Sequence, residues 1–223
     1  MPPSSPVIAI DGPAASGKGT IAKKLAKMFG FAHLDTGLLY RAVGVMVLLA
    51  NKSPDDARAA ARIARELTDT NLAKLKGDPV LRLDKASTAA SKVATHPGVR
   101  KALLKFQRDF AAHPPKRKKG AVLDGRDIGT VIVPKARVKI YVTASTEARA
   151  TRRFKELQKR SEKVAYKTVL AELKARDKRD ETRTAAPAKP AKDAVILDTT
   201  NMNADEAFTA ALAIVKKRMR AKA

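Results

Sequence analysis

Short apolar runs and amphipathic stretches alternate along most of the chain. Residues 7–10 form an apolar, β-branched run that leads into a glycine-containing turn, which predicts a buried strand followed by a loop. Residues 21–29 then place apolar side chains at helical spacing with lysines between them, and Gly30 is typical of a helix end. The side chains expected on the buried face of this helix are Ile21, Leu25, Met28 and Phe29.

The same alternation continues towards the C-terminus. Further short strands are predicted at 31–34, 121–124, 138–142 and 195–197. Further helices are predicted at 38–50, 99–112 and 166–180, and others begin after Ser145 and at Asn203. Strands that alternate with helices from end to end predict an α/β fold, with a parallel sheet covered by helices on both faces.

Several local signals refine this picture. Residues 53–56 predict a helix N-terminus, with Ser53 as the cap and Pro54 at the first helical position. The pattern over 68–98 is weaker, with a small hairpin predicted around 77–79 and alternation over 80–83, and we interpret it as an insert. Residues 184–192 are predicted to be a linker or mobile crossing segment. Asn203 and Glu206 fit a capping box. The final helix is expected to turn inward Phe208, Leu212, Val215 and Met219.

Composition narrows the classes of function. The chain has 223 residues, of which 44% are apolar and 30% charged, as expected for one α/β domain with or without inserts. It contains no cysteine, which excludes disulfide frameworks, thiolate nucleophiles, Cys-ligated zinc and iron–sulfur clusters. No N-terminal leader and no apolar run long enough to cross a bilayer is evident, so we expect a cytoplasmic protein with no membrane partner.

The chain is strongly basic, with a formal net charge of +24. Most of the excess lies between residues 100 and 192, which hold 27 Lys and Arg against 10 Asp and Glu. Such a charge suggests a polyanionic partner, and non-specific nucleic-acid binding is compatible with it. Aromatic residues make up only 4% of the chain and no helix-turn-helix is evident, so the charge alone supports that alternative.

The sharpest motif follows the first predicted strand and opens the first predicted helix. Glycines in this segment let successive backbone N–H groups point at a triphosphate, the helix dipole adds to the field, and Lys18 reaches the transferring phosphoryl oxygens. The alternative is a plain glycine turn before a helix. We predict an ATP-binding phosphate loop formed by Gly12, Pro13, Ala14, Ala15, Ser16, Gly17, Lys18, Gly19 and Thr20.

One position departs from the common form of this loop. Gly19 follows Lys18, and the hydroxyl comes one residue later at Thr20, so a direct metal contact from the loop is weakened. We predict no direct protein ligand for a metal. Mg²⁺ is expected to accompany ATP, held mainly by phosphate oxygens and water, with help from a carboxylate at a strand end as a further option.

Other phosphate-loop classes fit less well. A GTPase needs a guanine-reading Asn-Lys-x-Asp segment, and residues 51–54 fail at the last position. A motor or AAA-type ATPase needs an apolar strand that ends in Asp-Glu, but Asp124 is followed by Gly125. Instead, residues 35–41, 124–130 and 176–183 combine arginines with carboxylates and suggest a second phosphorylated substrate.

With these motifs in order, the sequence resembles the bacterial cytidylate kinases of the nucleoside monophosphate kinase superfamily over nearly its whole length. The resemblance is carried by residues 8–20, 34–41, 90–100, 123–129, 138–153, 175–183 and 197–200. It implies a P-loop three-layer α/β fold with a five-stranded parallel sheet, a monophosphate-binding insert and a lid. The implied division is a core of 1–51, 99–150 and 193–223, an insert of 52–98 and a lid region of 151–192. The implied reaction transfers the γ-phosphoryl group of ATP to CMP or dCMP, in an enzyme that we expect to be a monomer.

The resemblance also implies roles at matching positions. Thr36, Tyr40 and Arg41 lie at the acceptor nucleotide in the family pattern, and Arg41 and Arg126 would grip its phosphate. Ser91, Arg100 and Asp127 surround the cytosine, and Asp180 contacts the ribose. Arg176 and Arg183 bridge donor and acceptor phosphates, which makes Lys18, Arg126, Arg176 and Arg183 the catalytic set. Arg152, Arg153 and Arg179 are weaker candidates. The CMP-binding set is thus Thr36, Tyr40, Arg41, Ser91, Arg100, Arg126, Asp127, Arg176, Asp180 and Arg183.

Each residue also has a simpler interpretation. Asp124 and Asp127 are typical of turn caps, Tyr40 is typical of a core, and Arg176 with Asp180 fits a solvated helical ion pair. Two features depart from the family. Residues 83–88 are shorter than the family's stretch before the Ala-Ser helix and lack its acidic-Ile-Arg segment, and the loop and tail lysines exceed what two anionic substrates need. A nucleic-acid-binding protein, and a kinase of UMP, AMP or a small metabolite, therefore stay open as alternatives.

Overall fold

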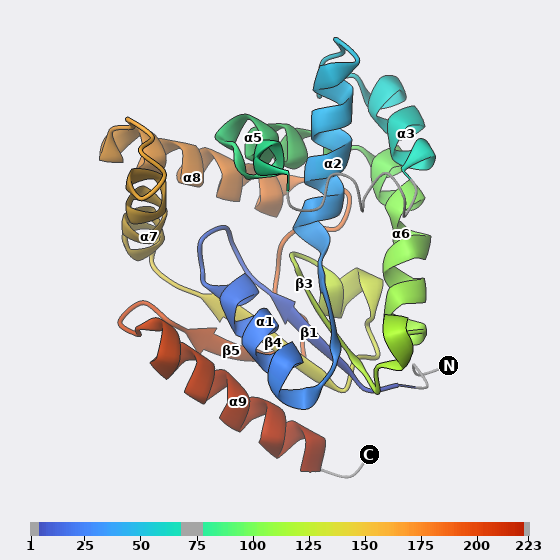
Figure 1. Cartoon of the computed structure of the whole chain (residues 1–223), viewed down its shortest axis with the longest axis vertical. Helices are drawn as coiled ribbons and strands as arrows, with labels where there is room; N and C mark the ends of the chain where they lie inside the picture. Colours follow the sequence, from blue (N-terminus) through green and yellow to red (C-terminus); the bar gives the residue numbers. More distant parts are fainter. Residues whose placement is uncertain (1–4, 68–77, 221–223) are drawn as a thin grey trace.

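A five-stranded parallel sheet forms the centre of the protein, as the computed structural model shows for the residues it describes, 5–67 and 78–220 (Figure 1). The strand order is β2-β3-β1-β4-β5, and every neighbouring pair is parallel. The carboxyl ends of all five strands therefore lie at one edge of the sheet, where loops gather and form a ligand site. The strands are β1 (Val7–Asp11), β2 (Ala32–Asp35), β3 (Ala121–Gly125), β4 (Val138–Thr143) and β5 (Val195–Asp198).

Helices cover both faces of this sheet, which confirms the predicted α/β class. The longer ones are α1 (Lys18–Phe29), α2 (Thr36–Leu49), α3 (Ala57–Glu66), α5 (Asp84–Val93), α6 (Pro97–Ala112), α7 (Thr146–Gln158), α8 (Tyr166–Thr182) and α9 (Ala204–Arg220). Short 3₁₀ turns η1 (Pro79–Arg82) and η2 (Pro115–Arg117) and a π-turn η3 (Ile128–Ile132) complete the described elements.

The central strand β1 divides the core into two layers. Ile8 and Ile10 pack with α1 and α9, whereas Val7 and Ala9 pack with α6 and η3 on the opposite face. This follows from the two-residue repeat of a strand, whose successive side chains point to opposite faces. All five β1 residues are buried, so the loop that follows β1 starts from a fixed position.

Two further helical groups border the loop edge of the sheet. Helices α2, α3, α5 and α6 share one apolar cluster, and α2 approaches α5 closely because Gly44 faces Ala89, where a Cβ at Gly44 would lie only 2.9 Å from the Ala89 Cβ. Helices α7 and α8 pack on each other through Leu157, Val169 and Leu173, and this cluster includes Ala14 of the phosphate loop. The two groups therefore lie on different sides of the loop edge of the sheet (Figure 1).

Some local predictions are confirmed. Gly30 ends α1 with a positive φ of 64°, Ser145 caps α7 by accepting from the Ala148 N–H, and residues 183–194 contain no helix or strand. The capping box is also present, since the Asn203 N–H donates to Glu206 and the Glu206 N–H donates to the Asn203 side chain. Val215 is buried, and Phe208, Leu212 and Met219 are partly buried against the same cluster.

Other local predictions are wrong. Asp56, not Ser53, caps α3, because its carboxylate accepts from the Arg58 and Ala59 N–H groups, while Ser53 accepts from Asp55 in the preceding turn. Residues 79–82 form a 3₁₀ turn started by Asp78 and not a strand, and Gly77 lies outside the described residues. Met28 is 53% exposed, because α9 covers only part of the α1 surface.

Candidate functional site

The phosphate loop joins the buried end of β1 to the first turn of α1. Gly12 has a φ of 150°, and a Cβ there would overlap the Val142 carbonyl oxygen, so only glycine fits this approach. Gly17 adopts a left-handed φ of 87° at the N-cap of α1. The N-terminal end of α1, with its positive dipole end, therefore faces the loop, which favours an anion there.

Lys18 is folded back over this loop. Its Nζ donates to the Pro13 carbonyl oxygen at 3.0 Å. Burial, helped by the nearby Arg126 guanidinium, lowers the pKa of Lys18 to about 7 against the attraction of Asp124. A polyanion bound at the loop would counter both effects, because it favours the charged ammonium form.

A cavity of about 390 Å³ opens beside the loop. Lys18 and Gly19 lie on one side of it, and α8 lies on another. The sequence-predicted residues that border this cavity are Ala14, Ala15, Lys18, Gly19, Arg41, Arg126 and Arg176, together with the weaker candidates Arg153 and Arg179.

A smaller cavity of about 50 Å³ lies on the far side of Arg126 and Arg176, both of which border the two cavities. It is enclosed by α2, α5, α6, α8 and the turn after β3. The sequence-predicted residues around it are Thr36, Tyr40, Ser91, Arg100, Arg126, Asp127, Arg176, Asp180 and Arg183. With Arg41, which borders the larger cavity, the whole predicted acceptor set lies around these two neighbouring cavities.

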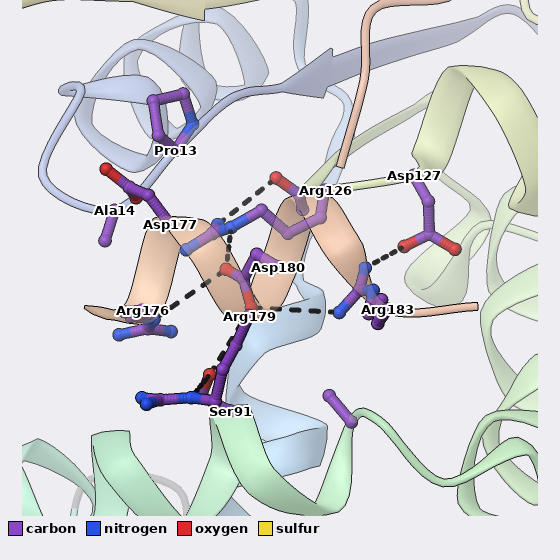
Figure 2. A network of polar contacts seen from close by, with 12 residues as sticks. Pro13, Ala14, Ser91, Arg126, Asp127, Arg176, Asp177, Arg179, Asp180 and Arg183 are labelled. Carbon is purple, nitrogen blue, oxygen red and sulfur yellow. Dashed lines mark hydrogen bonds and ion pairs between the residues drawn. The ribbon is translucent and has the colours of Figure 1, made fainter. Parts of the chain in front are cut away.

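Asp180 is the centre of an ion-pair network between the two cavities (Figure 2). Arg126 Nε donates to its carboxylate at 2.9 Å, and the Arg176 and Arg183 guanidinium nitrogens lie 3.9 Å from it. Burial acts to raise the pKa of Asp180, but these three arginines outweigh burial and hold the pKa below its ordinary value. The Arg176–Asp180 pair is thus present but is not the solvated pair of the simpler interpretation, since Asp180 is 5% exposed.

Asp127 organises the other end of the smaller cavity. It accepts a hydrogen bond from Arg100 Nη2, and Arg183 Nη2 lies 3.9 Å away. The Arg100 guanidinium also stacks over the Tyr40 ring at 5.4 Å, so Tyr40 contributes both to the core and to the cavity wall. Ser91 completes this wall, with its hydroxyl 3.4 Å from Asp180 and accepting from Arg179 Nε.

Two of the buried arginines retain unused donors. Within the described residues, Arg176 Nε and Arg183 Nη2 make no hydrogen bond. Burial lowers the pKa of Arg176 to about 10, with Arg126 adding to the effect. Unsatisfied buried donors are costly, at roughly 1–3 kcal/mol each, so these nitrogens are suited to an anionic acceptor that arrives from outside.

A third space, of about 560 Å³, lies on the other side of the phosphate loop. Loop residues 15–20 border it together with Thr199, Met202 and Arg152. Arg152 donates to the Thr199 and Met202 carbonyl oxygens, so its guanidinium holds the turn after β5 in place.

Arg149, which the sequence did not single out, links the phosphate loop to α8. Arg149 donates to the Ala14 carbonyl oxygen at 3.3 Å and to Asp177 at 2.7 Å, and its side chain is buried. Figure 2 shows Asp177 pointing from α8 towards Ala14. Helix α7 holds three arginines in its sequence, and nothing in the sequence distinguishes the buried Arg149 from the partly buried Arg152 and Arg153.

Carboxylates at neighbouring strand ends also border the larger cavity. Asp35 ends β2 and Asp124 lies near the end of β3, and the two are paired in register across the sheet. Burial raises the pKa of Asp35, and the neighbouring Asp124 raises it further. Asp124 is itself fixed by His33, whose Nε2 lies 2.7 Å from its carboxylate.

None of the helices in the described segments is long and apolar enough to span a membrane.

Comparisons with known proteins agree with this geometry. A family model described as cytidylate kinase matches residues 8–217. A cytidylate kinase of Paramagnetospirillum magneticum is 57% identical over 95% of this chain and 98% of its own length. A cytidylate kinase of Rhodospirillum rubrum is 54% identical over 94% of this chain and 96% of its own length. A cytidylate kinase of Azorhizobium caulinodans is 56% identical over 95% of this chain and 98% of its own length. An uncharacterized protein from Eubacterium ventriosum shares the fold, with a TM-score of 0.52 and 16% identity over 97% of this chain and 99% of its own.

Proposed function

The chain belongs to the cytidylate kinase family, and on that premise we propose how its neighbouring cavities carry out the reaction. The enzyme is an ATP-dependent nucleoside monophosphate kinase. It transfers the γ-phosphoryl group of ATP to CMP or dCMP, giving ADP and CDP or dCDP. The observation that carries this assignment is the position of Arg126 and Arg176, which border both the cavity at the phosphate loop and the smaller cavity beside it.

The phosphate loop is the ATP site. Loop residues border the 390 Å³ cavity on one side and the 560 Å³ space on the other. A triphosphate bound at the loop therefore has room for the nucleoside part of ATP in the 560 Å³ space. Lys18 leaves the Pro13 carbonyl and binds the phosphoryl oxygens. The γ-phosphoryl group then points towards Arg126 and Arg176.

The acceptor nucleotide fills the smaller cavity and reaches into the larger one. Arg126 and Arg41 bind its phosphate as charge-assisted forks. Asp180 contacts the ribose, and Thr36 and Tyr40 line the wall. Ser91, Arg100 and Asp127 read the cytosine, because a carboxylate accepts from the exocyclic amino group while the guanidinium donates to ring acceptors.

Arg176 and Arg183 complete the reacting site. Phosphoryl transfer requires in-line positioning and neutralisation of charge on several oxygens, and the acceptor is already an anionic phosphate oxygen that needs no general base. The unused N–H groups of these two arginines would stabilise the transferring group. Residues 151–192 act as a lid, 52–98 as the monophosphate-binding insert, and the remainder as the core.

Mg²⁺ accompanies ATP in this proposal. Asp35 and Asp124 provide the carboxylate oxygens that border the larger cavity, and oxygen donors of this kind suit Mg²⁺ and its bound waters. When bound, the ion neutralises phosphate charge. ATP and CMP or dCMP are then the small-molecule partners of a cytoplasmic, monomeric enzyme, and nucleic-acid binding is a non-specific effect of its charge.

A coupled ADP-release assay tests the proposal. The protein is mixed with ATP and Mg²⁺ and with CMP, dCMP, UMP, AMP, GMP or no acceptor, with a parallel reaction that contains RNA. We expect rapid turnover only with CMP and dCMP. ATP hydrolysis that ignores every monophosphate but rises with RNA would contradict the assignment and favour the nucleic-acid alternative.

Base selection should depend on Asp127 and Arg100. Asp127→Ala or Arg100→Ala is expected to lower the ratio of kcat/KM for CMP over UMP by about tenfold or more, because each removes a hydrogen-bonding group from the base pocket. Asp127→Asn should raise activity with UMP, since an amide can donate to the uracil oxygen. The measurement is kcat/KM for both acceptors.

An exposed carboxylate on α6, the helix that also holds Arg100, supplies the control for this prediction. Asp109→Asn removes an exposed pair with Lys105 on α6 and should leave the CMP to UMP ratio unchanged. Equal losses with both acceptors in the Asp127 variants would remove the base-reading role from this residue.

ATP binding should take up a proton above pH 7. The pKa of Lys18 is lowered to about 7 in the free protein, so most Lys18 is neutral at pH 8, whereas the triphosphate favours its ammonium form. ATP affinity is therefore expected to weaken as pH rises above 7. Calorimetry at pH 8 in two buffers of different ionisation enthalpy should show uptake of about one proton per ATP. The uptake should vanish in Lys18→Met and persist in Lys27→Ala; its absence from the unmodified protein would contradict the prediction.

A further inference from the structure

Asp11 is a buried carboxylate that the proposed reaction does not use. It ends β1, directly before the phosphate loop, and is 5% exposed. One oxygen accepts from the Ile128 N–H at 2.8 Å, and the other accepts from the Gly129 N–H at 2.8 Å. Within the described residues, no lysine, arginine or histidine nitrogen lies within 4.0 Å of it, although Lys18 and Asp127 influence its charge from further away.

The two N–H groups that Asp11 holds begin the π-turn η3. This turn follows Arg126 and Asp127 without an intervening residue, and Asp127 itself has an irregular backbone, with φ −144° and ψ 25°. The carboxylate thus fixes the position from which Arg126 and Asp127 extend.

The two segments that Asp11 joins serve different substrates. Its own backbone continues into the loop that binds ATP, and its side chain holds the turn that carries a phosphate-binding arginine and a base-reading carboxylate. Burying a carboxylate without an adjacent cation costs free energy, and burial raises the pKa of Asp11 to about 7. If this position only had to fill space, an apolar side chain would stabilise the fold more. Its two oxygens instead satisfy two parallel donors, which no apolar residue can do.

We propose that Asp11 is a positioning residue, which holds the Arg126–Asp127 turn in register with the phosphate loop so that the acceptor phosphate and base meet the γ-phosphoryl group. This inference rests on the acceptor roles proposed above for Arg126 and Asp127. It makes Asp11 specific for the acceptor side of the reaction, although it lies at the start of the donor loop.

Asp11→Asn tests this inference, because the amide keeps the shape but presents an N–H₂ group to one of the two backbone donors. We expect KM for CMP to rise about tenfold and the preference for CMP over UMP to fall, because one of the two hydrogen bonds that hold the turn is lost. KM for ATP should change less than about twofold, because the backbone N–H groups of the phosphate loop are unchanged. Amide hydrogen exchange at Ile128 and Gly129 should accelerate about tenfold. Asp11→Glu keeps the carboxylate but moves it by one methylene group relative to the Ile128 and Gly129 N–H groups, so it should show the same division between substrates if Asp11→Asn folds poorly.

Val215→Ala is the matched control, since it removes a buried side chain from the core cluster between β1 and α9 without touching the turn. It should lower the thermal midpoint and leave both KM values unchanged. Equal changes in the two KM values, or unchanged exchange at 128 and 129, would overturn the inference for Asp11. If Asp11→Asn accelerated exchange but left the preference for CMP over UMP intact, the inference that Asp11 positions the acceptor residues would be wrong. If Asp127→Ala also left this preference intact, the role proposed for Asp127 would be the error instead.

Discussion

Replacing Lys18 with alanine is expected to abolish phosphoryl transfer, with a fall in kcat of at least about a thousandfold. Lys18 is the one cation that the phosphate loop itself places at the larger cavity, and its ammonium group binds phosphoryl oxygens that gain charge in the transition state. The loop backbone should still bind ATP, because its N–H groups and the α1 dipole are unchanged. The measurements are kcat in the coupled assay and ATP affinity by calorimetry.

Lys27→Ala provides the matched control, because Lys27 lies exposed near the other end of the same helix. It removes one positive charge from α1 without touching the loop and should retain wild-type turnover. Turnover close to wild type in Lys18→Ala would mean that the loop does not bind the transferring phosphoryl group, and the donor site would have to be placed elsewhere.

Much of the fold follows from patterns that are local in sequence. The buried strand at 7–10, the glycine at the end of α1 and the alternation of strands with helices depend on neighbours in the chain, and all are present. The sequence favours Ser53 as the cap of α3, because Pro54 follows it at a position typical of the first helical residue. Only the packed position of the helix selects Asp56. Likewise, alternation over 80–83 cannot distinguish a strand from a 3₁₀ turn.

The site illustrates the limit of sequence reasoning more clearly. The predicted loop and arginines lie around neighbouring cavities, and they could be predicted because sequence motifs and the family resemblance mark these positions. Asp11 and Arg149 were missed, since each acts through a partner more than a hundred residues away, at Ile128 or Ala14. A single chain does not reveal which distant N–H or carbonyl group a buried charge will meet.

Arg126→Ala and Arg183→Ala are expected to lower kcat by about a hundredfold or more, with a smaller rise in KM for CMP. Arg126 borders both cavities, and Arg183 has a buried Nη2 that makes no hydrogen bond within the described residues. Donors that meet charge only as it develops contribute to kcat more than to binding. Both variants should fold, because Asp180 keeps two of its three neighbouring arginines in either case.

The form of the guanidinium provides a sharper test of the same prediction. Arg126→Lys keeps the charge but loses the planar fork, so it should recover only part of the activity lost in Arg126→Ala. Arg62→Ala, which breaks an exposed pair with Glu66 on α3, should leave kcat and both KM values unchanged. If Arg126→Ala raised KM for CMP while kcat stayed at the wild-type value, Arg126 would bind the acceptor equally in the ground and transition states. Lys18, Arg176 and Arg183 would then be the residues that stabilise the transition state.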